Sequence, residues 1–180
     1  MVPSNKTILR WELAGIAFVF LLGALLHFVF GWSGESWIVG AIAPVNESVW
    51  EHFKLGFWPM CLWTAIEYRV LQPLTRNFLP GKAVAVYMTP IVTGIMFYAY
   101  KGIVGRDILI VDIIIFALAV TIGQLTSYRI TTSRPLPGYA NPVALALILL
   151  LASMLIVTTF YPPHLPIFMD NNTGAYGLPQ

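Results

Sequence analysis

The chain has 180 residues, of which 58% are hydrophobic and 10% charged, and its mean hydropathy is +0.76. Soluble domains average roughly 45–50% apolar and about 25% charged residues, so this composition is typical of an integral membrane protein. The formal net charge of +2 comes from scattered basic residues, which excludes a nucleic-acid-binding surface. Because Cys61 is the single cysteine, an intrachain disulfide and a thiolate metal cage are also excluded.

Hydrophobic stretches along the chain predict an all-α fold, an integral membrane helical bundle of about five transmembrane helices in a single membrane domain. Each stretch is close to the roughly 20 residues that cross a bilayer as a helix. The second is the least apolar, because it contains Glu67 and Arg69, and it reaches spanning length only if its helix begins near Asn46. The predicted spans are residues 11–30, 46–71, 83–100, 108–127 and 142–161, and a non-helical tail follows over residues 162–180.

The basic residues predict the orientation of these spans, because cytoplasmic loops carry an excess of Lys and Arg. If the spans alternate in direction, seven basic residues fall on the side of the N-terminus and three on the other. The seven are Lys6, Arg10, Arg69, Arg76, Lys82, Arg129 and Arg134. The N-terminus is therefore predicted to be cytoplasmic and the C-terminal tail extracytoplasmic. Glu12 and Glu67 lie near Arg10 and Arg69 in the chain, and we expect them to be solvated or paired at the cytoplasmic interface.

The opposite face gathers most of the remaining titratable residues. Six of the eight acidic residues and all three histidines are expected at or near it. These are Glu35, Glu47, Glu51, Asp107, Asp112, Asp170, His27, His52 and His164. The tail is rich in Pro, Gly and Asn but also in aromatic residues, so we expect it to fold back over this end of the bundle as a lid.

Residues 46–54 carry the strongest functional signal, because they concentrate charge in an otherwise apolar chain. On a helix Glu47 and Glu51 share one face and are separated by about 6 Å of rise, which is close enough to hold a cation or share a proton. Oxygen and imidazole ligands suit a divalent metal ion. The predicted metal ligands are Glu47, Glu51, His52, His164 and Asp170. A wider polar pocket is predicted to bind a ligand through Asn46, Glu47, Trp50, Glu51, His52, Lys54, Lys101 and Asp112.

A structural role explains part of the same segment. Ser48-Val49-Trp50-Glu51 fits the S-x-x-E capping box, in which the serine caps a helix and the glutamate returns a bond to the cap backbone. Lys54 would then pair with Glu51 or Glu47. Asp112, near the start of a span, must face the bundle and could pair with Lys101 rather than bind a ligand. His27 on an apolar helix is more often structural than a ligand.

Three parts of the chain together resemble a known family. They are the motif Asn46-Glu47-Ser48-x-Trp50-Glu51-His52-x-Lys54, the following Phe57-Trp58-Pro59, and the late block from Pro162-Pro163-His164 to Tyr176-Gly177. The chain is similar over most of its length to a family of small prokaryotic multi-pass membrane proteins known only as a domain of unknown function. The resemblance implies a location in the cell inner (cytoplasmic) membrane and assigns no activity.

Three functions fit these residues. The leading one is a membrane protein with an extracytoplasmic polar pocket that binds a cation or small polar ligand, for transport or sensing. The second is a membrane-embedded, metal-dependent hydrolase acting on a lipid or lipid-linked substrate, with one carboxylate as general base. The third is a membrane scaffold or partner subunit with a structural polar network. The expected partners are the lipid bilayer and a small ligand or ion, without nucleic acid, and no residue pattern indicates an oligomeric state.

Overall fold

The computed structural model describes residues 5–179, and these residues form five long helices. The long helices are α1 (Asn5–Trp32), α3 (Val49–Leu71), α4 (Phe78–Val104), α5 (Leu109–Thr131) and α6 (Ala140–Phe160), and the short ones are α2 (Trp37–Gly40), η1 (Gln72–Leu74) and η2 (Pro166–Phe168). Within the described residues the one β-type pairing is an isolated bridge between Met169 and Tyr176. The predicted all-α fold is confirmed.

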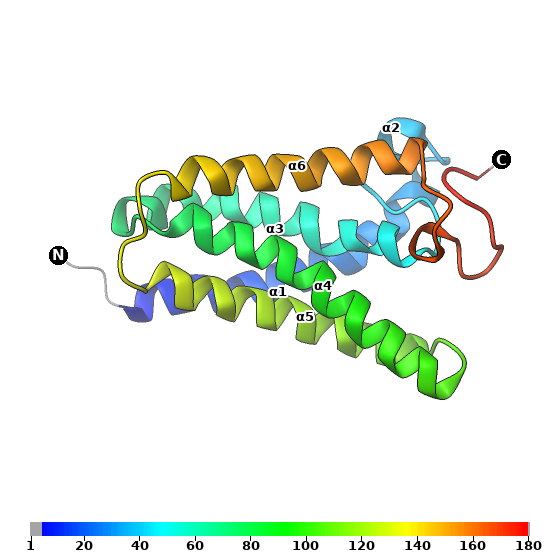
Figure 1. Ribbon diagram of the computed structural model, residues 1–180, viewed down its shortest axis with the longest axis horizontal. Helices are drawn as coiled ribbons and strands as arrows, with labels where there is room; N and C mark the ends of the chain where they lie inside the picture. The colour runs from blue at the N-terminus through cyan, green and yellow to red at the C-terminus, as the bar shows by residue number, and fades with distance from the viewer. Residues whose placement is uncertain (1–4, 180) are drawn as a thin grey trace.

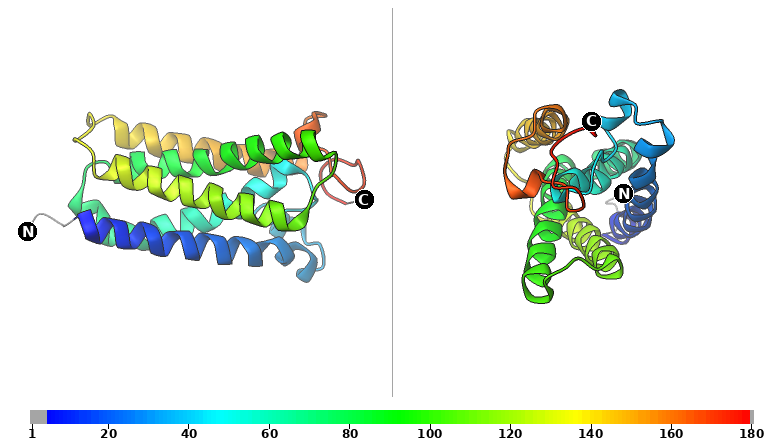
Figure 2. Two further views of the ribbon diagram at one scale, coloured as in Figure 1. Left: turned by 90° about the horizontal axis from the view of Figure 1, so that it is seen from below. Right: turned by 90° about the vertical axis from the view of Figure 1, so that its right-hand side faces the viewer.

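The long helices lie roughly side by side in an elongated bundle (Figure 1). Figure 2 shows the same bundle from below and from its right-hand end, where the tail crosses the helix ends. Helix α3 packs against α1, α4 and α6. Helices α4 and α5 pack against each other, and in addition α4 packs against α6 and α5 against α1. The loops before α3, between α4 and α5, and after α6 therefore meet at one end, which we call the tail end. The α5–α6 and α3–α4 connections lie at the opposite end, which we call the hairpin end.

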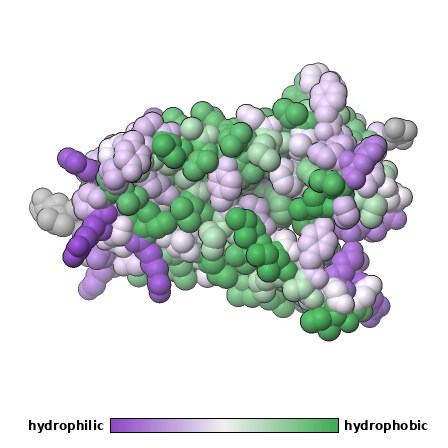
Figure 3. All heavy atoms as spheres, in the orientation of Figure 1, coloured by the Kyte–Doolittle hydropathy of each residue, from purple (hydrophilic) through white to green (hydrophobic). Residues whose placement is uncertain are grey.

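Four of these helices, α1, α4, α5 and α6, are long and apolar enough to cross a membrane. Hydrophobic residues cover the middle of the face shown in Figure 3, and hydrophilic residues gather toward both ends. Helix α3 has 23 residues but is not among the four, and it differs from the predicted second span in beginning at Val49. Its charged residues include Glu51, Lys54 and Glu67, all of which are buried against neighbouring helices rather than exposed to lipid.

All five long helices contribute to one hydrophobic core. Val19 of α1, Phe57 of α3, Val86 of α4, Val120 of α5 and Leu155 of α6 are each at most 1% exposed. In membranes, where lipid is as apolar as the side chains, small residues allow the close helix contact that stabilises a bundle. A Cβ atom at Gly23 of α1 would lie 2.4 Å from the backbone carbonyl oxygen of Leu55 in α3. This approach therefore requires glycine.

Candidate functional site

The loop before α3 sets the position of Glu47, the first of the predicted metal ligands along the chain. Ser48 has an extended backbone, and its hydroxyl accepts a hydrogen bond from the Glu51 backbone N–H at 3.2 Å. The Ser48 backbone N–H donates to the Asn46 side chain instead of to Glu51, so the predicted capping box is half formed. Since the helix begins only at Val49, Glu47 lies in the preceding loop and does not share a helical face with Glu51.

His27, Glu47 and His52 come together at the tail end, and we call them the histidine–glutamate cluster. The Nε2 atom of His52 lies 3.3 Å from one Glu47 carboxylate oxygen, and Nε2 of His27 lies 3.9 Å from the other. One ligand atom from each residue can be chosen so that all three lie within 4.8 Å of one another. The side chains are 31%, 44% and 28% exposed in chain order, so the cluster is open to solvent on one side.

A hydrogen bond orients the His52 ring toward the Glu47 carboxylate. His52 Nδ1 lies 2.8 Å from the Ser48 carbonyl oxygen, to which it can donate, and this directs Nε2 toward Glu47. Metal-binding histidines are commonly oriented in this way, through a hydrogen bond from the other ring nitrogen. When His52 carries protons on both ring nitrogens, its hydrogen bond holds the pKa of Glu47 below the ordinary value of 4.5, although partial burial opposes this. Glu47 is thus an anionic oxygen ligand at neutral pH.

The tail fixes the backbone on both sides of the Glu47 side chain. The Glu47 N–H donates to an Asp170 carboxylate oxygen at 3.1 Å, and the Asn171 side chain donates to the Glu47 carbonyl oxygen at 2.7 Å. Asn46 donates to the Gly177 carbonyl oxygen at 2.8 Å. Partial burial acts to raise the pKa of Asp170. Hydrogen bonds from the backbone N–H groups of Thr173, Glu47 and Asn172 outweigh this effect, and the pKa is below its ordinary value of 3.8. The tail does fold over this end, and it contacts the cluster through the backbone of Glu47.

Glu51 and Lys54 belong to a separate, closed network. Lys54 is fully buried, and its Nζ donates to Glu51 at 2.7 Å, to Thr159 at 2.6 Å and to the Gly40 carbonyl oxygen at 2.7 Å. The other Glu51 oxygen accepts from Thr159 at 2.9 Å. The backbone N–H of Val45 also donates to Glu51. This network ties the α2–α3 loop and α6 to α3, and it offers no open coordination position.

The other predicted site residues lie at the tail end but make separate contacts. Trp50 donates to Thr158 at 2.7 Å and packs against Phe168 with the two rings tilted. Lys101 donates to Asn171 at 2.8 Å, while Asp112 accepts from the Tyr100 hydroxyl at 2.5 Å. His164 packs against Tyr176 with ring centroids 4.7 Å apart. Of the predicted metal ligands, the structure brings Glu47 and His52 together and adds His27, which we had expected to be structural.

A second charged cluster lies toward the hairpin end, formed by Glu12, Glu67 and Lys82. Lys82 Nζ lies 2.7 Å from Glu12 and also forms an ion pair with Glu67, and all three residues are 0% exposed. The two acids are paired, as one form of the expectation had it, but they are not solvated, and their common partner is a buried lysine of α4. The sequence does contain a signal for the pairing of Glu67 with Lys82, because the two residues are equally far from the α3–α4 turn. Glu67 is four residues from the end of α3 and Lys82 four from the start of α4, and short loops make antiparallel neighbours.

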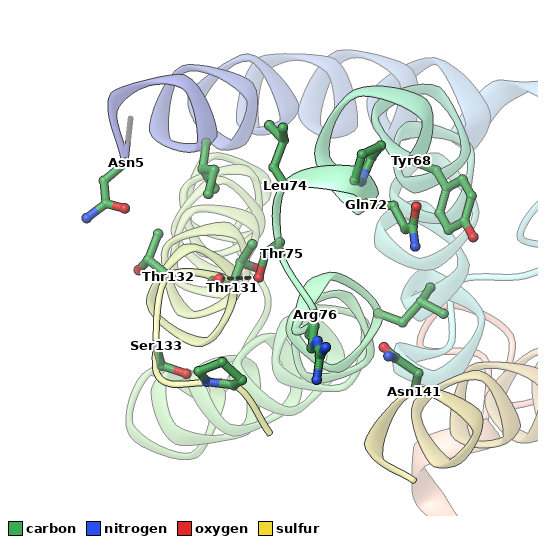
Figure 4. A pocket seen from close by; sticks show the side chains of 14 residues that line it. Asn5, Tyr68, Gln72, Leu74, Thr75, Arg76, Thr131, Thr132, Ser133 and Asn141 are labelled. Carbon is green, nitrogen blue, oxygen red and sulfur yellow. Dashed lines mark hydrogen bonds between the residues drawn. The ribbon is translucent and has the colours of Figure 1, made fainter. Parts of the chain in front are cut away.

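A hollow of about 560 Å³ also lies at the hairpin end, away from the histidine–glutamate cluster. Figure 4 shows the polar side chains around it, among them Gln72, Arg76 and Asn141. Its wall also includes Ile8, Tyr68 and Leu79. The hollow is partly open to solvent, and its wall is both polar and apolar.

The bundle, its apolar middle and its four spanning helices define a multi-pass helical membrane protein. The chain belongs to the family of unknown function DUF6512, whose family model matches residues 2–178. No curated protein and no solved structure matches the chain.

Proposed function

We propose that this membrane protein binds one divalent transition-metal ion through Nε2 of His27, the Glu47 carboxylate and Nε2 of His52. The observation that supports this most directly is the convergence of these three ligands from α1, the α2–α3 loop and α3. Two imidazoles and a carboxylate suit zinc, iron or manganese. Ligands bound at about 2.0–2.1 Å in a tetrahedral site are roughly 3.4 Å apart. The two separations from Glu47 are 3.3 and 3.9 Å, and all three ligand atoms lie within 4.8 Å of one another, so the side chains must move closer together to reach that geometry.

Metal binding is proposed to serve sensing at the extracytoplasmic face of the cytoplasmic membrane. The basic residues favour that orientation. Since Glu47 contributes a ligand through its side chain and holds Asp170 and Asn171 through its backbone, an ion bound there also fixes the docked tail. Three protein ligands and a solvent-facing side leave room for a water molecule or an exchanging ligand.

The alternative of a metal-dependent hydrolase has less support from the same geometry. General-base catalysis requires a carboxylate that is free to take a proton from metal-bound water. Glu51 is occupied by Lys54, Thr159 and a backbone N–H, and Asp170 accepts three backbone hydrogen bonds. A binding role therefore fits the described residues better than hydrolysis.

Calorimetric titration of the chelator-treated, purified protein with Zn²⁺ and Mn²⁺ tests the proposal. The unsubstituted protein should bind one ion. His27→Gln, Glu47→Gln and His52→Gln should each weaken binding by more than the roughly 10–100-fold typical of losing a residue that only hydrogen bonds to a metal ligand. His164→Gln is the matched control, because that ring packs on Tyr176 outside the cluster. Absence of saturable binding of either ion, or an equal loss in the control, would rule out this site.

A further inference from the structure

The buried cluster of Glu12, Glu67 and Lys82 lies far from the proposed metal site. Glu12 and His27 are both in α1 and are 15 residues apart, which is about 22 Å at 1.5 Å per residue. The cluster joins α1, α3 and α4 directly. It also includes α5, because Ser127 donates to Glu12 at 2.8 Å and Gln124 accepts from Lys82 at 3.3 Å. It is therefore a polar centre shared by four helices.

The charges of this cluster do not balance. Two carboxylates face one ammonium group, all without solvent exposure, and the other side chains in contact with them, Gln124, Ser127 and Trp63, are neutral. An unpaired buried charge is strongly destabilising, and two carboxylates that share a site do not readily ionise together. One added proton makes the cluster neutral.

Hydrogen bonding indicates which carboxyl group takes that proton. Both oxygens of Glu12 accept hydrogen bonds, one from Lys82 at 2.7 Å and one from Ser127 at 2.8 Å, as an ionised carboxylate requires. Glu67 forms an ion pair with Lys82 and lies beside the Trp63 indole, but among the described residues neither of its oxygens accepts a well-aligned hydrogen bond. Glu67 is thus the group that is stabilised less as an anion.

Two buried donors beside the cluster also lack partners. The Gln124 side-chain nitrogen and the Trp63 indole nitrogen donate no well-aligned hydrogen bond within the described residues, although Gln124 is 0% and Trp63 8% exposed, and the Trp63 nitrogen lies beside Glu67. Both sit against Gly15, where a Cβ atom would lie 2.2 Å from the first and 2.5 Å from the second. Buried donors of this kind normally bind protein groups or ordered water. The cluster is therefore flanked by hydrogen-bond donors that its protein contacts do not fully use.

The hollow at the hairpin end is close to this cluster along the chain. Three residues of the hollow wall lie next to the three charged residues in the chain: Ile8 is one helical turn from Glu12, Tyr68 adjoins Glu67, and Leu79 is three residues from Lys82. Water on that side is therefore the expected source and acceptor of a proton that the cluster exchanges.

We propose that the Glu12–Lys82–Glu67 cluster is a proton-binding site, in which Glu67 carries one exchangeable proton while Glu12 stays ionised and paired with Lys82. Release of that proton to water leaves a net negative charge among four helices and weakens their association. This site is independent of the proposed metal site, and neither requires the other.

Infrared spectroscopy of the purified protein in lipid nanodiscs tests the proposal. At neutral pH the protein should show the C=O stretch of a buried, protonated carboxyl group, and Glu67→Gln should remove it. Asp112→Asn is the control, since Asp112 is another acid within a helix but hydrogen bonds to Tyr100, so this variant should keep the band. Glu12→Gln should also remove the band, because Glu67 then ionises to balance Lys82.

Thermal unfolding provides a second readout. The melting temperature of the unsubstituted protein should fall as the pH rises and Glu67 loses its proton. The melting temperature of Glu67→Gln, which imitates the protonated group, should not show this fall. Identical carboxyl spectra for the unsubstituted protein and Glu67→Gln, or the same pH dependence of melting in both, would overturn the proposal.

Discussion

Lys54 and Glu51 form an ion pair of 2.7 Å from which solvent is excluded, and Thr159 of α6 bonds to both of them. Lys54→Met should therefore leave Glu51 buried without its cation. We expect the free energy of unfolding to fall by about 3–5 kcal/mol, the usual cost of breaking a buried pair from one side. Unfolding in mixed micelles measures this. Lys101→Met, which removes a partly exposed lysine 3.9 Å from Asp107, should cost at most about 1 kcal/mol. Equal losses in the two variants would contradict a structural role for the Lys54 network.

The contact of α1 with α3 at Gly23 gives a prediction about packing. Gly23→Ala places a methyl group 2.4 Å from the Leu55 carbonyl oxygen, so the two helices must separate. We expect a destabilisation of about 1–3 kcal/mol, the range for overpacking a core. Gly31→Ala, in the same helix with nothing within 4 Å of the new atom, should be neutral or slightly stabilising. Unfolding midpoints of the two variants measure the difference. Equal midpoints for Gly23→Ala and Gly31→Ala would contradict the close contact of α1 with α3.

The docked tail should depend on the ionised form of Asp170. Its carboxylate accepts from the backbones of Asn172 and Thr173 within the tail and of Glu47 across the contact. Because the pKa of Asp170 is below its ordinary 3.8 in the folded protein, its stabilisation is complete above that value and is lost as the pH falls through the lower, folded value.

Asp170→Ala should accordingly expose residues 165–179 to hydrogen exchange at neutral pH and remove the additional exchange seen in acid. The cost should be about 2 kcal/mol, as for hydrogen bonds to a charged group. Asp107→Asn is the control, since Asp107 is about half exposed and far from the tail turn in the chain. Tail exchange that is unchanged in Asp170→Ala would refute this account.

The proposed orientation can be tested by thiol labelling in a Cys61→Ser background. Asn172→Cys lies in the tail and Gly138→Cys in the α5–α6 loop, and both positions are exposed at opposite ends of the bundle. A membrane-impermeant reagent added to intact cells should label Cys at position 172 and spare position 138. The reverse pattern would place the histidine–glutamate cluster on the cytoplasmic side.

The sequence predicted the helical bundle because its apolar segments are long, but it misplaced groups within the site. Placing Glu47 and Glu51 on one helical face assumed a helix that began near Asn46. Ser48 caps the helix instead, so Glu47 turns to His52 and Glu51 turns to Lys54. A shift of three residues in a helix start thus separated two carboxylates into different networks.

The partners of Glu12 and His27 could not be predicted for another reason. Each depends on which faces of neighbouring helices meet, and helices that are apolar on all sides carry no pattern that marks the buried face. Lys82 approaches Glu12 from α4, and Glu47 approaches His27 from a loop 20 residues later in the chain. Such contacts are fixed by the packing of the whole bundle rather than by local sequence.

The charges buried along α3 bear on how the protein enters the membrane. A single charged side chain at the centre of an isolated helix opposes insertion by about 2.5–3.5 kcal/mol, and α3 carries Glu51, Lys54 and Glu67. Lys82, which pairs with Glu67, belongs to α4 and is synthesised later. On its own α3 is therefore a poor candidate for insertion, and the pairing of Glu67 with Lys82 favours packing of α3 against α4 as a hairpin.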